Sequence, residues 1–249
     1  MKTKIIIATH KEYTMPASKS YIPLWVGAEV SRTYKGQYPG DNTGDNISFD
    51  NSNFNELTGL YWIWKNVDAD YKGLVHYRRY IGVIGGGGND IKNIIESESV
   101  ENLLEKYDVV VPSPKKFYIF SAYKHYINSI NGMKETHKND LEMLRNAVRK
   151  VSPEYLPALE KVYHSRQVHM LNMFIMKRTD FDRYCSWLFE VLFEMEKNVK
   201  RYRVLGAMGE FLLDTYMITN QMSYVEMPLI ELEKVPLYKK VYNRIRKML

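Results

Sequence analysis

The amino-acid sequence predicts an α/β fold in which a mainly parallel sheet is flanked by helices. Short β-rich runs such as Lys4–Ala8 alternate along the chain with longer apolar patterns of helical period. Such alternation is typical of parallel sheets, whose strands are joined by crossover helices. A length of 249 residues and a hydrophobic share of 45% fit one domain with a sizeable core.

The predicted elements begin with a buried strand at Lys4–Ala8. Residues 12–54 are rich in Pro, Gly, Asn, Asp and Ser, which predicts a long irregular excursion. The four consecutive glycines at 85–88 predict a flexible loop. They do not form a phosphate-binding P-loop, since the lysine and the spacing of that motif are missing. Further strands are predicted at 71–75, 108–112, 170–176 and 223–225, and helices at 55–66, 99–106, 138–150, 153–164, 180–198 and 206–220.

The cysteine content and the hydropathy of the chain indicate in which cellular compartment the protein is expected. Cys185 is the single cysteine, which excludes an internal disulfide and a multi-cysteine zinc site. The apolar run near the N-terminus covers only Ile5–Ala8, which is too short for a signal peptide. No run approaches the roughly 20 apolar residues of a membrane span. We therefore expect a cytoplasmic protein.

The net charge of +6 is concentrated at the C-terminus. Five cations and no acid lie in 236–249, and apolar residues are interleaved with them as in a basic amphipathic helix. We expect this helix to follow a domain of residues 1–235 and to lie on the anionic inner face of a plasma membrane. A packed terminal helix with a solvated face is the alternative. The remainder is nearly neutral, which argues against nucleic acid as a partner.

Ligands of parallel α/β sheets bind beyond the carboxyl ends of the strands. This rule selects the residues after the first strand, Thr9, His10 and Lys11, and the motif at 76–80, which contains His76, Arg78 and Arg79. A guanidinium group fits phosphate oxygens with a planar fork, so the paired arginines predict a diphosphate ligand. The alternatives are a structural ion pair with a nearby acid and a solvated surface pair.

Glu210 is the candidate catalytic base, since small residues precede it at the start of an apolar helix. A carboxylate there would deprotonate an acceptor hydroxyl. The alternative is that an acid simply favours the first helical turn.

His169 and Asn172 lie beside the strand predicted at 170–176 and are candidates for hydrogen bonds to sugar hydroxyls, with a purely structural role as the alternative.

No convincing metal site is predicted. Asp68-Ala69-Asp70 has the form of a metal-binding Asp-x-Asp motif, but it precedes the strand at 71–75, whereas such a motif should follow one. Asp41 and Asp45 lie in a loop, where acids usually form turns. We therefore expect metal-independent chemistry, in which cations and a helix terminus neutralise a leaving diphosphate, while Mn²⁺ or Mg²⁺ stays an open alternative.

Several segments together resemble a known family. They are Asp45–Ser48, Asn55–Asn66, Gly73–Tyr80, Asn172–Met176 and Gly209-Glu210, and the match extends from about Lys4 to about Ser223. The chain is similar to the bacterial capsular-polysaccharide synthesis family once catalogued as a domain of unknown function. The resemblance implies a GT-A-type glycosyltransferase with a Rossmann-like sheet that binds a UDP-sugar. Relatives in that family include galactofuranosyltransferases of O-antigen assembly.

The combined hypothesis is an inverting transfer of a galactose form from a UDP-sugar to a lipid-linked oligosaccharide. Thr9, His10 and Lys11 would contact the nucleotide, Arg78 and Arg79 would hold the diphosphate, His76 would be a further contact to the nucleotide-sugar, and Glu210 would be the base. Additional candidate contacts to the donor are Asp41, Asp45 and Asn46, and to the acceptor Glu56, His169 and Asn172. A retaining course would need no such base. Two other functions stay open: a non-catalytic carbohydrate-binding or scaffolding subunit, which twenty tyrosines and four tryptophans would suit, and a nucleotidyltransferase.

Overall fold

The computed structural model describes residues 1–86, 88–129, 133–199 and 201–233. Its main sheet has eight strands: β1 (Thr3–Thr9), β2 (Tyr21–Trp25), β3 (Tyr71–His76), β4 (Arg79–Ile81), β5 (Val109–Pro112), β8 (Phe174–Lys177), β9 (Tyr224–Met227) and β10 (Leu229–Glu231). A two-stranded sheet joins β6 (Lys115–Lys116) to β7 (Gln167–Val168). The predicted helix at 236–249 and the boundary at 235 lie outside the described residues.

The helices of four or more residues are α1 (Asn51–Phe54), α2 (Leu57–Asn66), α3 (Ser97–Leu104), α4 (Ala122–Ile127), α5 (Lys134–Val151), α6 (Leu156–His164), α7 (Arg178–Glu196) and α8 (Val204–Thr219). Short 3₁₀ turns lie at Ser48–Asp50, Ile91–Asn93 and Pro153–Tyr155. Among the described residues, no helix is both long and apolar enough to cross a bilayer.

The sheet is mixed and mainly parallel, which confirms the predicted α/β class. β1 pairs in parallel with β2 and β3, and β5 pairs in parallel with β9. β8 runs antiparallel between β3 and β5, so those two strands point the same way. The carboxyl ends of β1, β3 and β5 therefore lie at one edge of the sheet.

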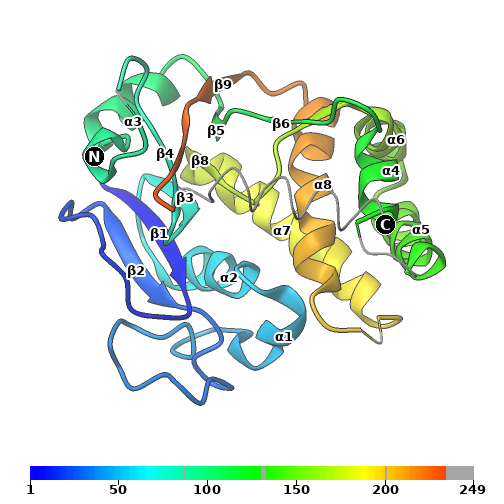
Figure 1. Cartoon of the computed structure of the whole chain (residues 1–249), viewed down its shortest axis with the longest axis horizontal. Helices are drawn as coiled ribbons and strands as arrows, with labels where there is room; N and C mark the ends of the chain where they lie inside the picture. Colours follow the sequence, from blue (N-terminus) through cyan, green and yellow to red (C-terminus); the bar gives the residue numbers. More distant parts are fainter. Residues whose placement is uncertain (87, 130–132, 200, 234–249) are drawn as a thin grey trace.

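Alternating side chains divide the core into two layers. Ile6 and Leu74 face α2, α7 and α8, whereas Ile5 and Val75 face α3. Figure 1 shows α4, α5 and α6 gathered beyond α8, on the side away from the sheet. The long helix α8 is therefore buried between the sheet and an outer helical layer, which explains why its sequence is apolar nearly all round.

Several predicted boundaries were wrong, and three of the differences concern the region described below. The excursion at 12–54 contains β2, a short apolar run that is partly buried and pairs in parallel with β1. The strand predicted from Met170 begins only at Phe174, since Leu171 and Asn172 have φ values of 79° and 54° and break the extended conformation. Helix α8 begins at Val204, two residues before the predicted start, so Glu210 lies in its second turn.

Candidate functional site

A cavity of about 400 Å³ opens at the sheet edge where β1 and β3 end. The motif at 76–80 reaches it because His76 pairs with Arg79 across a tight hairpin that places Tyr77 and Arg78 at the turn. The cavity brings together six of the predicted site residues from distant parts of the chain: His10, Glu56, His76, Arg78, Arg79 and Glu210. Residues that directly follow β1 and β3, which the rule for parallel sheets selected, therefore form two walls of this cavity.

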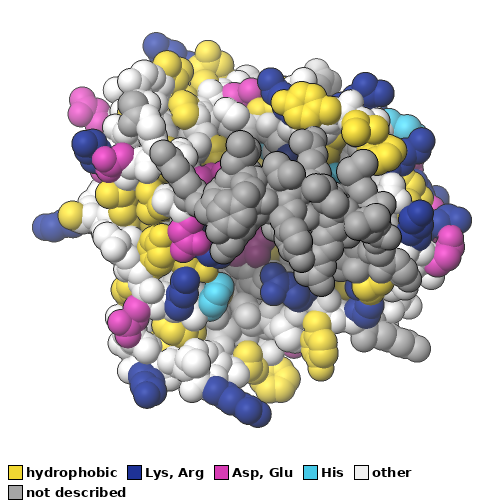
Figure 2. All heavy atoms as spheres, in the orientation of Figure 1, with side chains coloured by type: hydrophobic (Ala, Val, Ile, Leu, Met, Phe, Trp, Pro, Cys, Tyr) yellow, Lys and Arg dark blue, Asp and Glu magenta, His cyan; other side chains and the backbone are white. Residues whose placement is uncertain are grey.

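One wall of the cavity is cationic. Tyr77 is buried, and its ring lies 4.7 Å from the Arg78 guanidinium carbon and 5.4 Å from the Lys11 ammonium nitrogen. Burial, followed by the positive charges of Arg78, Lys11 and Arg203, lowers the pKa of His10. The neutral form of His10 is therefore favoured, chiefly by burial and in addition by the positive charges around it. Figure 2 shows Lys, Arg and His side chains gathered around a hollow near the middle of one face.

Both arginines of the motif carry acid partners. Arg78 Nη1 lies 2.6 Å from Glu233 Oε2, and Arg79 Nε lies 3.3 Å from Glu231 Oε1. The ion-pair alternative from the sequence is therefore real. The side chains of Arg78 and Glu233 are 38% and 43% exposed, however, and exposed pairs are weak enough to exchange partners. Any anion that bound at these arginines would therefore compete with the two carboxylates.

Two carboxyl groups lie opposite the cations. Glu210 Oε1 accepts a 3.1 Å hydrogen bond from the backbone N–H of Leu171. Burial, followed by repulsion from Glu56, raises the pKa of Glu210 to about 7, against the opposing effects of the Leu171 hydrogen bond and of nearby cations. A carboxyl group with this pKa is matched to proton transfer at neutral pH.

Close packing holds Glu210 in place. A Cβ atom on Gly206 would come within 2.4 Å of Asn55 Nδ2 and 3.0 Å of the Phe54 carbonyl oxygen. A Cβ on Gly209 would come within 3.0 Å of Asn172 Oδ1. The two glycines therefore allow the first turns of α8 to approach the residues that surround the cavity.

The turn at 171–172 is fixed from two sides. His76 Nε2 lies 2.7 Å from the Leu171 carbonyl oxygen, and hydrogen bonding there requires that Nε2 carry the proton. Asn172 Nδ2 donates to Glu56 Oε1 at 2.7 Å and to the Gly206 carbonyl oxygen at 3.0 Å. Asn172 is buried and acts here as a positioning residue.

Thr9 and Asp41 have structural roles that differ from the predicted nucleotide contacts. The Thr9 hydroxyl is buried and donates to the Lys11 carbonyl oxygen at 2.6 Å. Asp41 is fully buried, and its carboxylate accepts hydrogen bonds from the backbone N–H groups of Gly27 and Ala28 at 2.9 and 3.0 Å. It also accepts from the hydroxyls of Ser48 and Thr58. Asp41 organises the loop behind the cavity and does not line it.

Asp45 and Asn46 likewise lie outside the cavity lining. Asp45 accepts a 3.1 Å hydrogen bond from Tyr61, and Asn46 bonds within its own turn to Gly44 and Ser48. His169 lines a different cavity, beside Asp214. Within the described residues, no group of three or more His, Cys, Asp or Glu side chains is arranged to hold a metal ion.

Sequence reasoning missed several residues that line the cavity. They are Asn51, Asn55, Leu171 and Arg203, in addition to Tyr77 of the motif. Arg203 directly precedes α8, which begins at Val204, and the φ of Arg203 is 65°. A cation just before a run of small and apolar residues was the available signal for an anion site at this position.

The comparisons with known proteins agree with this architecture. The solved apo structure of WbbM, described as a bifunctional glycosyltransferase, matches 94% of this chain with a TM-score of 0.80 and 27% sequence identity. The match covers 46% of the WbbM chain, so this chain spans about half the length of that protein. No curated protein matches. A family model described as "Domain of unknown function (DUF4422)" matches residues 4–221, and the chain belongs to that family.

Proposed function

We propose that this protein is a glycosyltransferase that moves a hexose from a UDP-sugar to an acceptor hydroxyl with inversion at the anomeric carbon. One observation carries the proposal: a carboxyl group with a pKa of about 7, Glu210, shares a cavity with a cationic wall. A base and an anion-binding surface are the two groups that such a transfer needs. The likeness to WbbM, a glycosyltransferase by its description, supports the same class of reaction.

The donor would lie with its diphosphate against the cations. Arg78, Arg79 and Arg203 line the cavity, and Lys11 adds to the positive field at its rim. These charges would stabilise UDP as it leaves with the electron pair of the bond to the anomeric carbon. His10 is neutral and would donate or accept a hydrogen bond on the nucleotide side. We infer that the guanidinium groups replace a divalent ion in this role.

The acceptor hydroxyl would attack from the side of Glu210. As its oxygen bonds to the anomeric carbon and the bond to UDP breaks, its proton passes to the Glu210 carboxylate. Oε1 is held by the Leu171 N–H, which fixes the orientation of the carboxylate. Glu56, held by Asn172, would hydrogen-bond to a sugar hydroxyl in the same cavity.

The family resemblance supports galactose or galactofuranose as the sugar. It also supports a lipid-linked oligosaccharide of capsule or O antigen as the acceptor. The basic segment at 236–249 would then hold the enzyme on the inner face of the plasma membrane, close to that acceptor. Liposome pelleting with and without residues 236–249 tests this last step: the truncated protein should stay in the supernatant, and equal pelleting would contradict membrane binding through this segment.

The central test is Glu210→Gln. We expect turnover of UDP-galactofuranose or UDP-galactose, measured as UDP release with a lipid-linked acceptor, to fall by roughly 100-fold or more. UDP affinity by calorimetry should change little, because the cationic wall is untouched. Glu98→Gln, on the exposed side of α3, is the matched control. EDTA should leave the rate unchanged. A wild-type rate for Glu210→Gln would remove Glu210 from the mechanism.

A further inference from the structure

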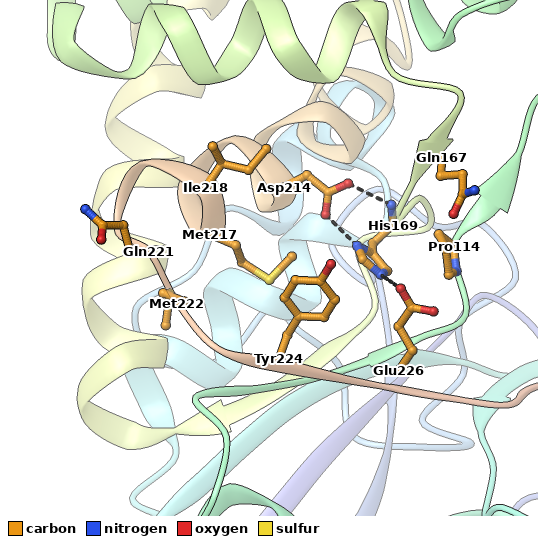
Figure 3. A pocket seen from close by; sticks show the side chains of 10 residues that line it. All are labelled: Pro114, Gln167, His169, Asp214, Met217, Ile218, Gln221, Met222, Tyr224 and Glu226. Carbon is orange, nitrogen blue, oxygen red and sulfur yellow. Dashed lines mark hydrogen bonds and ion pairs between the residues drawn. The ribbon is translucent and has the colours of Figure 1, made fainter.

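A second cavity, of about 390 Å³, lies beside the C-terminal half of α8. Its lining comes from α8, from β9 and from the segment around β7, as Figure 3 shows. His169 and Asp214 form one side of it, Tyr224 and Glu226 of β9 form another, and Met217 extends from α8. The cavity is distinct from the proposed donor site, and the steps described above do not use it.

His169 supplies a buried polar group at this cavity. One edge of the imidazole is hydrogen-bonded: Nδ1 lies 2.6 Å from Asp214 Oδ1, and the His169 backbone N–H donates to Asp214 Oδ2 at 3.0 Å. The residue is only 5% exposed, and its Nε2 makes no hydrogen bond. The Glu226 carboxylate lies 3.4 Å from Nε2, close enough for an ion pair. Nε2 therefore has an ion-pair partner but no hydrogen bond, and the Glu226 side chain is 43% exposed, so a ligand hydroxyl that hydrogen-bonds to Nε2 would be favoured.

The charges of the two cavities are opposite. The described residues that line the His169 cavity include two carboxylates, Asp214 and Glu226, and neither lysine nor arginine. Three arginines line the donor cavity. The His169 cavity would therefore repel a nucleotide diphosphate and accept a neutral ligand. Tyr224 is 45% exposed and offers an aromatic face, and polar side chains at Gln167 and Gln221 offer hydrogen bonds. A ligand with C–H faces and hydroxyl groups, such as a sugar ring, matches this combination.

The two cavities are neighbours along one helix. Glu210 and Asp214 are four residues apart in α8, so their side chains lie on one face of the helix, about 5–6 Å apart at Cβ. The segment that follows β7 binds both acids, since Leu171 N–H donates to Glu210 and His169 N–H donates to Asp214. A ligand in the His169 cavity is therefore one helical turn from the proposed base.

We propose that the His169 cavity is a second saccharide subsite, which binds a neutral sugar unit of the acceptor chain. The acceptor role rests on the proposed transferase function, whereas the binding of a neutral sugar does not. Tyr224 packs against the ring, and His169 Nε2 and Glu226 bond to its hydroxyls. The cavity thus holds the acceptor next to Glu210 while the donor occupies the cationic cavity.

Methionine methyl NMR gives a direct test. Met217 and Met222 line the cavity, and their [¹³C]methyl resonances can be assigned with the Met217→Leu and Met222→Leu variants. The probes are the methyl glycosides of galactopyranose, galactofuranose, glucose, mannose, rhamnose and N-acetylglucosamine. We expect at least one of them to shift both resonances in a saturable way, and UDP to leave them in place.

Two variants identify the contacts. Tyr224→Ala should abolish the saturable shift, and the isosteric Glu226→Gln should weaken it several-fold. Tyr118→Ala is the matched control, because Tyr118 is 79% exposed and lines neither cavity. If none of the six glycosides moves the Met217 and Met222 resonances, the proposal is wrong. It is equally wrong if ethanolamine shifts them and the glycosides do not, since the cavity would then be a cation site.

The test separates this inference from the transferase proposal. Sugar-dependent shifts in a protein that releases no UDP would preserve the subsite and overturn the reaction. The acceptor role has its own readout, since Tyr224→Ala should raise the acceptor KM at least several-fold while UDP affinity stays unchanged. An unchanged acceptor KM would reject that role.

Discussion

The side-chain amide of Asn172 donates a 2.7 Å hydrogen bond to Glu56, a residue 116 positions away in the sequence. The same amide nitrogen donates to the Gly206 carbonyl oxygen at 3.0 Å, so one buried side chain ties the start of α2 to the start of α8. Asn172 has a φ of 54°, a conformation that asparagine adopts more readily than most residues. This bond fixes the position of Glu56, whose charge raises the pKa of Glu210.

Asn172→Asp should therefore change the pH dependence of transfer. A carboxylate at this position would lie beside Glu56 and would make ionisation of Glu210 still less favourable. We expect the acidic midpoint of the pH–rate profile to move upward by about one pH unit. Asn172→Gly tolerates the positive φ, adds no charge and releases Glu56, so its midpoint should lie at or below that of the wild type. Equal midpoints for the Asp and Gly variants would contradict this coupling.

The raised pKa of Glu210 also predicts how rate and stability depend on pH. The base works as a carboxylate, so turnover should rise with pH through about 7. The folded state holds the Glu210 proton more tightly than the unfolded state, where the pKa is near 4.5. This contribution to stability is complete below pH 4.5 and is lost as pH rises through 7.

Replacement of Glu210 by the neutral glutamine should remove that loss. Relative to the wild type, Glu210→Gln should gain about 2–3 kcal/mol more in unfolding free energy at pH 8 than at pH 5. Urea denaturation at the two pH values measures the difference. A stability difference that does not depend on pH would mean that Glu210 titrates normally.

Gly206→Ala tests the close approach of α8. In a helix, alanine is favoured over glycine by about 1 kcal/mol. The added Cβ would nevertheless meet the Phe54 carbonyl oxygen at 3.0 Å and Asn55 at 2.4 Å. We expect a net loss of about 1–3 kcal/mol in urea unfolding, typical of an overpacked site. Ala207→Ser, in the same turn, should cost about 0.5 kcal/mol. A stabilised Gly206→Ala protein would contradict this packing.

Glu233→Gln tests competition for Arg78. The substitution removes the carboxylate 2.6 Å from the guanidinium and leaves Arg78 available to the ligand diphosphate. UDP affinity at low ionic strength should rise by about two- to five-fold, which corresponds to the strength of a typical exposed pair. Asp90→Asn breaks a different ion pair, with Lys92, and serves as the control. Weaker UDP binding by Glu233→Gln would show that Glu233 orders Arg78 for the ligand.

The sequence by itself determined the fold class and two walls of the site. Its hydrophobic periodicity specified strands at 4–8 and 71–75, and the sheet rule then placed His10, His76 and Arg78 at one edge. These features are local, since a strand and the residue that follows it are adjacent in the chain. Glu210 was selected as the candidate base from equally local information, the small residues directly before it.

The tertiary structure alone decided which residues meet. The partner of Arg78 is 155 positions away, and the Asn172 turn interrupts a run whose composition resembles a strand. Asp41 and Asp45 look equivalent in the sequence, but only Asp41 is buried and fully bonded. Such contacts depend on how whole elements pack, and a single sequence does not encode that packing in any short window. The separation of a cationic cavity from an acidic one on the same helix face was therefore visible only in the folded protein.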